Sequence, residues 1–357
     1  MTTYLLAGGG TAGHVNPLLA VADGLRARDP EAEVLVLGTR EGLEARLVPE
    51  RGYELLVVDK VPFPRRPNRD AAAFPTRFRR AIAQARTHLR DRGVEVVAGF
   101  GGYASAPAYV AARREGVPVV IHEANALPGL ANRLGARSAA AVGVAFAGTR
   151  LRGARVVGMP LRREIVELDR DALRAEAADH YGLDAGTPTL LVFGGSWGAQ
   201  RLNDAFAGTY RDVLDAGYQL VHITGELREG SSVEAPGYVT PRYEDRMDLA
   251  YALADVIVSR AGAATVSEIE ALGIPAVFVP YAVGNGEQAR NAAAAVEAGA
   301  AVLIPDAELT PDRIRSDVIP LLHDEARLAR MRAAVATVGT RAGTDNVIAL
   351  IDEALRR

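Results

Sequence analysis

Gly8-Gly9-Gly10-Thr11-Ala12-Gly13-His14 is the stretch that decides the fold, because it follows the apolar run of residues 4–7 and precedes a helix-like segment. A second glycine-rich stretch half a chain later, Gly194-Gly195-Ser196-Trp197-Gly198-Ala199-Gln200, follows the apolar run 190–193 in the same way. Each loop places backbone N–H groups and a helix N-terminus where a phosphate can bind. Two such loops predict two nucleotide-fold domains of the α/β class that face one cleft.

The first loop also fits the G-x-G-x-x-G fingerprint of dinucleotide-binding folds, which requires an acidic residue at the end of the second strand. The second apolar run, residues 34–37, leads into Gly38-Thr39-Arg40 and has no acid at that point. An arginine there suits the 2′-phosphate of NADP, so an NADP-binding oxidoreductase stays open as an alternative. His14 disfavours it, because a transferase needs a base beside a bound diphosphate and a dehydrogenase does not.

Composition describes an ordinary globular protein of 357 residues, 49% hydrophobic and 24% charged, with a net charge of −3. This length favours two domains over one core, and the charge balance gives no argument for nucleic-acid binding. The absence of cysteine excludes disulfides, thiolate metal sites and a cysteine nucleophile, and it fits a reducing compartment. We find no signal-peptide pattern and no apolar run near the roughly 20 residues that cross a bilayer, so the sequence predicts a cytosolic location.

Short apolar runs alternate with longer amphipathic stretches along the chain, which is the pattern of βαβ units and parallel sheets. Residues 156–162 end the first series of runs with a glycine and a proline, and this predicts a hinge. We therefore expect an N-terminal Rossmann-like domain over residues 1–161 and a C-terminal one over 162–339. The last helix, residues 340–357, has no strand left to cover in the second domain and is expected to pack back on the first.

Residues 60–80 depart from this alternation of apolar and amphipathic segments. They hold seven basic side chains and one acid, with Phe63, Phe74 and Phe78 interleaved. One interpretation is a solvated loop and helix start whose apolar stripe, including Phe78, faces inward. The other is contact with an anionic membrane surface, to which each basic group contributes about 1 kcal/mol. The stripe does not account for Phe63 and Phe74, so both interpretations stay open.

Residues 259–268, Ser-Arg-Ala-Gly-Ala-Ala-Thr-Val-Ser-Glu, follow another apolar run and open a helix. Small residues let a ligand approach the helix N-terminus, whose amides and dipole would face phosphate. Glu268, one turn inside, can accept two hydrogen bonds from a ribose diol. The alternative is that Thr265 and Glu268 are merely first-turn helix residues. The stretch Asn285–Asn291 that follows favours a nucleoside diphosphate site.

Taken together, these blocks resemble glycosyltransferase family 28, whose members have the GT-B fold of two Rossmann-like parallel-sheet domains facing an interdomain cleft. The resemblance runs nearly end to end. It rests on Gly9–Val15 with Pro17, Leu37-Gly38-Thr39 with Glu44 and Val48-Pro49, Gly101-Gly102-Tyr103, His122-Glu123-Ala124-Asn125, Gly158–Arg162, Gly194-Gly195-Ser196 and Ala254–Glu268.

The resemblance implies an inverting transferase that moves N-acetylglucosamine from UDP-N-acetylglucosamine to the C4 hydroxyl of the muramyl-pentapeptide of lipid I. That acceptor is linked to undecaprenyl pyrophosphate, and the product is lipid II of peptidoglycan synthesis, made by a peripheral enzyme at the cytoplasmic face of the membrane. No cofactor is implied. The residues that match the family's donor contacts are Thr11, Ala12, Gly13, Asn125, Arg162, Ser196, the backbone at Glu244, Ala263, Ala264, Thr265, Val266, Ser267, Glu268 and Gln288. Gly101-Gly102-Tyr103 matches a loop suspected of holding the acceptor diphosphate.

Metal dependence is not expected. Asp169-Arg170-Asp171 has the D-x-D form that other glycosyltransferases use to hold a cation, but it lies in a polar helical stretch near the hinge and not after a strand. Arg162 and helix N-termini can balance the charge of the leaving diphosphate instead.

Two residues are candidates for the base that takes the proton of the acceptor hydroxyl. His14 matches the family histidine implicated in catalysis, and Glu123, at the mouth of the strand that starts at Val117, is its competitor. Three further functions stay open on the same scaffold: a non-hydrolysing UDP-sugar epimerase, another GT-B sugar transferase and a non-catalytic sugar-nucleotide sensor.

Overall fold

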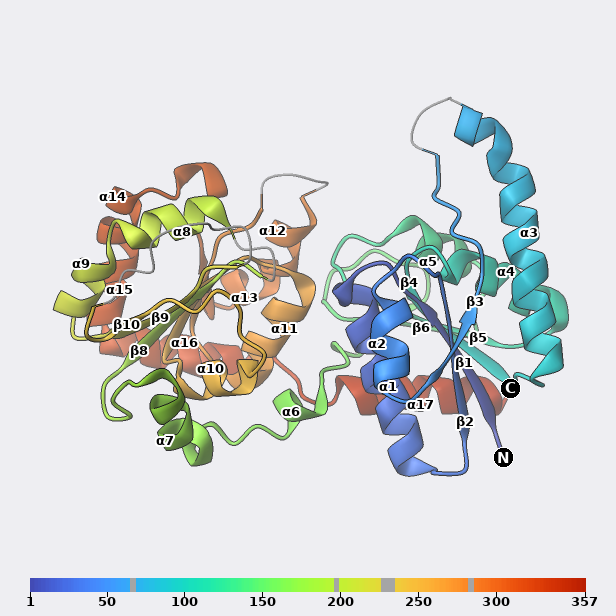
Figure 1. Ribbon diagram of the computed structural model, residues 1–357, viewed down its shortest axis with the longest axis horizontal. Helices are drawn as coiled ribbons and strands as arrows, with labels where there is room; N and C mark the ends of the chain where they lie inside the picture. The colour runs from blue at the N-terminus through green and yellow to red at the C-terminus, as the bar shows by residue number, and fades with distance from the viewer. Residues whose placement is uncertain (65–68, 196–198, 226–234, 282–285) are drawn as a thin grey trace. The chain divides into compact units, whose positions relative to one another are not determined.

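The computed structural model describes residues 1–64, 69–195, 199–225, 235–281 and 286–357 (Figure 1). The chain forms two compact units, Met1–Arg162 with Arg341–Arg357, and Arg163–Thr340. Each unit is a parallel sheet with helices packed on it, so the predicted α/β class is confirmed. Within the described ranges, no helix is long and apolar enough to cross a membrane.

The strands described in the first unit form one seven-stranded parallel sheet in the order β3-β2-β1-β4-β5-β6-β7. Their bounds are β1 Thr3–Gly8, β2 Glu33–Gly38, β3 Glu54–Val57, β4 Val96–Gly101, β5 Val119–Glu123, β6 Ala141–Val144 and β7 Ala154–Val156. The chain moves outward from β1 to β3 and then returns to β4, so the strand order reverses between β1 and β4. The loops after these two strands therefore flank the switch point, where open α/β sheets bind ligands.

Helices cover both faces of this sheet, with bounds α1 Ala12–Arg28, α2 Glu44–Glu50, α3 Arg69–Asp91, α4 Ser105–Glu115, α5 Leu130–Gly135 and α17 Gly343–Leu355. Successive side chains of a strand point to opposite faces of the sheet. Because helices cover both faces here, every residue of β1 is buried and the strand is a continuous apolar run. Tyr4 and Leu6 point into the core cluster on one face, and Leu5 and Ala7 point into the cluster on the other face.

The last helix, α17, belongs to the first unit and packs against α1. Ile348 lies over Gly24 of α1 so closely that a Cβ at this glycine would be 2.8 Å from its Cδ1. An ion pair joins Arg28 Nη1 of α1 to Asp352 Oδ2 at 2.7 Å. Asn346 Nδ2 donates to the carbonyl of Val157 at 3.0 Å. The end of the chain thus completes one face of the first core.

The second unit repeats the arrangement, because its described strands form a six-stranded parallel sheet in the order β10-β9-β8-β11-β12-β13. The bounds are β8 Thr189–Phe193, β9 Gln219–Ile223, β10 Tyr238–Val239, β11 Val256–Ser259, β12 Ala276–Phe278 and β13 Ala301–Leu303. Its helices include α6 Arg163–Val166, α7 Arg170–Tyr181, α8 Gln200–Ala207, α9 Tyr210–Asp215, α10 Met247–Leu253, α11 Ala263–Leu272, α12 Glu287–Asn291, α13 Ala293–Glu297, α14 Pro311–Arg313, α15 Ile319–His323 and α16 Glu325–Val338. The switch point here lies between β8 and β11, so the loops after those strands are the candidate ligand loops.

Candidate active site

The candidate residues of the first unit begin at the loop between β1 and α1, and His14 lies in the first turn of α1. Its Nδ1 lies 3.1 Å from the carbonyl oxygen of Gly9 and 3.2 Å from Thr11 Oγ1. Because a carbonyl oxygen can only accept, this contact with Gly9 places the imidazole proton on Nδ1. Nε2 then carries the lone pair, which is the arrangement a general base needs.

The loop after β4 packs against the same histidine. A Cβ added at Gly101 would lie 3.1 Å from His14 Nε2, and one at Gly102 would lie 2.2 Å from the carbonyl oxygen of Gly9. Both glycines have positive φ angles, +93° and +87°, which other residues rarely adopt. Tyr103 follows them on the surface, with Lys60 Nζ 5.4 Å from its ring centroid. The two glycine loops of the first unit are therefore in direct contact beside His14.

A buried carboxylate behind the first loop was not predicted from the sequence. Glu44 accepts hydrogen bonds from Gly10 N at 2.7 Å, Thr39 N at 2.9 Å and Thr39 Oγ1 at 2.8 Å. Three glycines surround it so closely that a Cβ would come within 2.0 to 2.5 Å of a Glu44 atom: Gly9, Gly38 and Gly42. The amide of Gly10 is thus already engaged, and a negative charge behind the loop disfavours a dinucleotide pyrophosphate there.

Glu123 lies at the end of β5 and is 2% exposed. One oxygen accepts from Asn125 N at 2.9 Å, and the other accepts from Gly129 N at 3.0 Å and Asn132 Nδ2 at 3.0 Å. Asn132 is held in turn by Tyr109, whose hydroxyl donates to its Oδ1 at 2.7 Å. Both oxygens of Glu123 therefore hold the loop that carries Asn125.

His122, next to Glu123, has a structural contact of its own. Its Nε2 lies 3.0 Å from the carbonyl oxygen of Gly158, at the start of the predicted hinge segment. Burial lowers the pKa of the His122 imidazole to about 4, so the ring stays neutral and donates from Nε2 to this carbonyl. Arg162, at the end of that segment, is half-buried.

The candidate residues of the second unit lie at the β11–α11 turn. Gly262, in extended conformation, precedes α11, and the helix starts with the small residues Ala263 and Ala264. The first amides of an α-helix have no partner inside the helix and can donate to an anion. Glu268 is half-buried one turn further on, and its Oε2 accepts from the Tyr251 hydroxyl at 2.8 Å. Thr265 is also half-buried, whereas Val266 and Ser267 are buried.

The neighbouring loops of the second sheet are tied to this turn. Arg260 Nη1 donates to the carbonyl of Val279 at 3.0 Å and lies 2.6 Å from Asp306 Oδ1. Its guanidinium carbon lies 5.4 Å from the ring centroid of Tyr281. Tyr281 N donates to Gln288 Oε1 at 2.8 Å, which places the predicted donor contact Gln288 beside the loop after β12.

Glu244 lies in the loop before α10, and its carboxylate is used within the protein. Its Oε2 accepts from the Tyr181 hydroxyl at 2.8 Å and lies 3.2 Å from His180 Nε2, while Oε1 accepts from Arg246 N at 2.7 Å. Burial and this carboxylate raise the pKa of the Tyr181 hydroxyl above its ordinary range. The side chain thus anchors the loop to α7.

The structure therefore assembles two residue sets at the carboxyl ends of two sheets. In the first unit, Thr11 is the N-cap of α1 and Ala12, Gly13 and His14 form its first turn, and the loop after β4 links them to the Asn132–Glu123–Asn125 network. In the second unit, α11 carries Ala263 to Glu268, contacts the helix α12 that carries Gln288, and receives the Tyr251 hydrogen bond from α10. Ser196 lies outside the described residues. Sequence reasoning missed the supporting roles of Glu44, Asn132, Tyr109 and Tyr251.

Two Rossmann-like units, each with candidate ligand loops at its switch point, are the architecture of GT-B glycosyltransferases. Residues 4–144 match the glycosyltransferase family 28 N-terminal domain, and residues 189–347 match the glycosyltransferase family 28 C-terminal domain. The chain belongs to glycosyltransferase family 28, and the resemblance inferred from the sequence is confirmed.

Curated relatives cover nearly the whole chain. The UDP-N-acetylglucosamine–N-acetylmuramyl-(pentapeptide) pyrophosphoryl-undecaprenol N-acetylglucosamine transferase of Clavibacter sepedonicus is 59% identical over 99% of this chain and 97% of its own length. The transferase of the same name from Leifsonia xyli subsp. xyli is also 59% identical, over 98% of each chain. Among solved structures, Acinetobacter baumannii MurG superposes with a TM-score of 0.80 and 28% identity, over 99% of both chains. These matches do not favour the oxidoreductase, epimerase and sensor alternatives.

Proposed function

We propose that this chain transfers N-acetylglucosamine from UDP-N-acetylglucosamine to the C4 hydroxyl of the muramyl-pentapeptide of lipid I, and forms lipid II by an inverting displacement. The observation that carries the proposal is the 59% identity, over 99% of the chain, to a relative named for this transfer. In the direct test, the purified protein is incubated with UDP-N-acetylglucosamine and lipid I, and lipid II and UDP are quantified. Sugar-nucleotide turnover without the lipid acceptor would favour an epimerase instead.

The first unit supplies the base and the acceptor loops in this proposal. The C4 hydroxyl oxygen attacks the anomeric carbon from the face opposite UDP, the bond from that carbon to the diphosphate oxygen breaks, and UDP leaves with the electron pair. His14 Nε2 takes the hydroxyl proton, because Nδ1 already donates its own proton to Gly9. Gly101-Gly102-Tyr103, which contacts the His14 loop, holds the acceptor diphosphate.

The second unit holds the donor. The N-terminal amides of α11 face the diphosphate, and Glu268 accepts from the ribose hydroxyls. The backbone at Glu244 and the side chain of Gln288 contact the remaining parts of UDP-N-acetylglucosamine. Arg162, with Ser196, adds charge and hydrogen bonds at the leaving diphosphate.

The transfer is proposed to be independent of metal ions. Asp169 of the D-x-D stretch is the N-cap of α7, because its carboxylate accepts from Ala172 N at 3.1 Å. Where the structure describes side chains, no group of three or more His, Asp or Glu residues is arranged to hold a metal ion. We expect lipid II synthesis to persist in EDTA and to fall strongly in Arg162→Ala. Loss of activity on chelation and recovery with magnesium would contradict this proposal.

Residues 60–80 are proposed to dock on the anionic cytoplasmic face of the membrane. Three aromatic rings pack together where the segment ending at residue 64 meets α3: the Phe63, Phe74 and Phe78 centroids lie 5.3 to 6.2 Å apart. In this cluster, Phe63 and Phe74 both have packing partners, which the apolar stripe of the helix alone does not give them. Arg65 and Arg66 lie outside the described residues.

We expect Arg65/Arg66/Arg69→Ser to weaken binding to anionic vesicles, and we expect binding of the parent protein to fall as salt rises. Exposed charges separated by more than the Debye length, about 8 Å at physiological ionic strength, are largely screened. Co-sedimentation with vesicles of anionic and of neutral lipid measures the effect. The matched control is Arg327/Arg330/Arg332→Ser, which removes three exposed arginines from α16 of the second unit. Equal vesicle binding by the two triple variants would contradict the proposal.

A further inference from the structure

Tyr251 on α10 is a buried side chain that contacts the proposed ribose carboxylate. It is 1% exposed, and its hydroxyl donates to Glu268 Oε2 at 2.8 Å. We propose that Tyr251 is a positioning residue for the donor: its hydroxyl holds the Glu268 carboxylate in the orientation that accepts the ribose diol. This inference rests on the proposed function, because it concerns how the same site recognises UDP.

The Tyr251 ring is itself held in place. Its centroid lies 6.1 Å from that of Phe193 at an interplanar angle of 70°, an edge-to-face contact that favours one ring orientation. Phe193 is the last residue of β8, directly before the second glycine-rich loop. The backbone carbonyl of Tyr251 accepts from Arg170 Nε at 3.0 Å. The hydroxyl is therefore presented to Glu268 from a side chain that is fixed at its ring and at its backbone.

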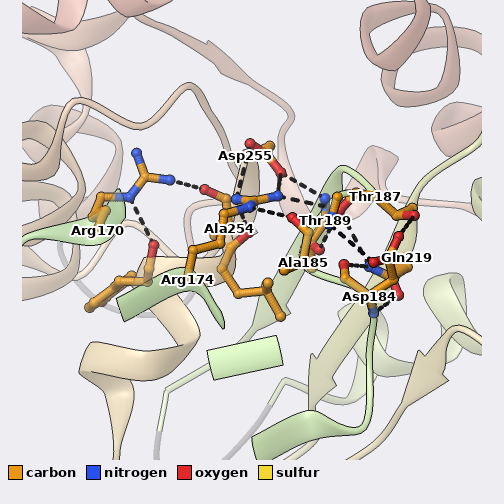
Figure 2. Close-up of polar contacts among 12 residues, drawn as sticks. Arg170, Arg174, Asp184, Ala185, Thr187, Thr189, Gln219, Ala254 and Asp255 are labelled. Carbon is orange, nitrogen blue, oxygen red and sulfur yellow. Dashed lines mark hydrogen bonds and ion pairs between the residues drawn. The ribbon is translucent and has the colours of Figure 1, made fainter. Parts of the chain in front are cut away.

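An arginine pair on α7 anchors the C-terminal end of α10, as Figure 2 shows. Arg170 also donates to the carbonyl of Ala254, and Arg174 Nη2 lies 2.9 Å from Asp255 Oδ2. The same Asp255 oxygen accepts from Thr189 N at 2.9 Å, at the start of β8. Cations at a helix C-terminus are favourable because the carbonyl ends carry partial negative charge. These contacts fix the position of α10, and with it Tyr251, relative to β8 and β11.

The chemistry of the ribose diol requires a carboxylate that is already oriented. A carboxylate has about four lone-pair sites on its two oxygens. The Tyr251 hydroxyl donates to one of these sites, on Oε2. A half-buried glutamate has several rotamers, and ordering it only when the ligand arrives lowers the affinity. Tyr251 removes that ordering step.

The test compares Tyr251→Phe with the parent protein by calorimetry, with UDP and 2′-deoxy-UDP as ligands. We expect the Kd for UDP to rise about tenfold, as for the loss of one hydrogen bond to a charged group. The Kd for 2′-deoxy-UDP, which lacks one of the two hydroxyls, is expected to rise by less than about threefold, because it uses less of the oriented carboxylate. The KM for UDP-N-acetylglucosamine should rise while kcat stays close to that of the parent.

Tyr238→Phe is the matched control, because it also removes a buried tyrosine hydroxyl from the second unit. That hydroxyl lies 3.0 Å from His222 Nδ1 on the neighbouring strand, and both nucleotides should bind this variant as they bind the parent. If Tyr251→Phe weakens UDP and 2′-deoxy-UDP equally, its role is only structural and the inference is overturned. If Tyr251→Phe keeps the full preference for UDP while Glu268→Ala loses it, the inference also falls, but the proposed function stands. A parent protein without any preference for UDP over 2′-deoxy-UDP would overturn the ribose role of Glu268 and this inference together.

Discussion

We expect the His14→Ala enzyme to lose about 10²–10⁴-fold in kcat, the usual contribution of a positioned general base, and to keep nearly the parent affinity for UDP. In the proposed mechanism the reason is the tautomer: Nδ1 donates to the carbonyl of Gly9, and Nε2 is the atom proposed to accept the proton. Alanine leaves the attacking hydroxyl without a base. Steady-state synthesis of lipid II gives kcat, and calorimetry with UDP gives the affinity.

His323→Ala is the matched control, because it removes an exposed imidazole at the end of α15 and should leave kcat unchanged. Glu123→Gln separates the two candidate bases. An amide keeps only one acceptor oxygen, so the loop held through Asn125 and Gly129 should loosen, and thermal stability should fall together with activity. The roles would be exchanged if Glu123→Gln gave the larger kcat loss at unchanged stability and His14→Ala mainly weakened UDP binding.

The fold and the loops of the site could be predicted from the sequence because their signals are local. The apolar runs and the glycines at their ends indicate parallel strands that lead into helices. His14 lies in the first turn of the helix after such a loop, and Glu268 lies in the second turn of α11. The last helix has an amphipathic stripe and no strand left to cover in the second unit, which predicts that it packs on the first unit. In the structure, Ile348 of α17 packs on Gly24 of α1.

The supporting residues could not be predicted, because their partners are far apart in the chain. Glu44 entered the sequence analysis only as part of the family resemblance, and only the fold brings the amide of Gly10 to it. Tyr251 and Glu268 lie on different helices separated by β11, so no periodicity connects them. Asn132 contacts Tyr109 from another helix in the same way. What links these pairs is the packing of helices at the carboxyl edge of a sheet, which single-sequence patterns do not specify.

We expect Glu268→Ala to weaken UDP binding about 10²–10⁴-fold, because two hydrogen bonds to a charged group are lost at about 1.5–3 kcal/mol each. The half-buried carboxylate is held by the Tyr251 hydroxyl, so its loss also leaves that buried hydroxyl without this acceptor. Calorimetry with UDP measures the affinity directly. Glu268→Gln keeps one acceptor oxygen and should fall between the parent and the alanine variant.

Glu297→Ala is the matched control for charge, because this exposed glutamate ends α13 in the same unit and should leave the Kd unchanged. Unchanged UDP affinity in Glu268→Ala would refute the ribose role. A large loss of kcat at unchanged UDP affinity would instead place Glu268 against the transferred sugar or the reacting centre. The α11 N-terminus would then hold the diphosphate without a ribose anchor, and recognition of the nucleoside would have to come from the loop of Glu244. That loop is fixed to α7 through Tyr181 independently of Glu268, so Tyr181→Phe should lower UDP affinity in that case.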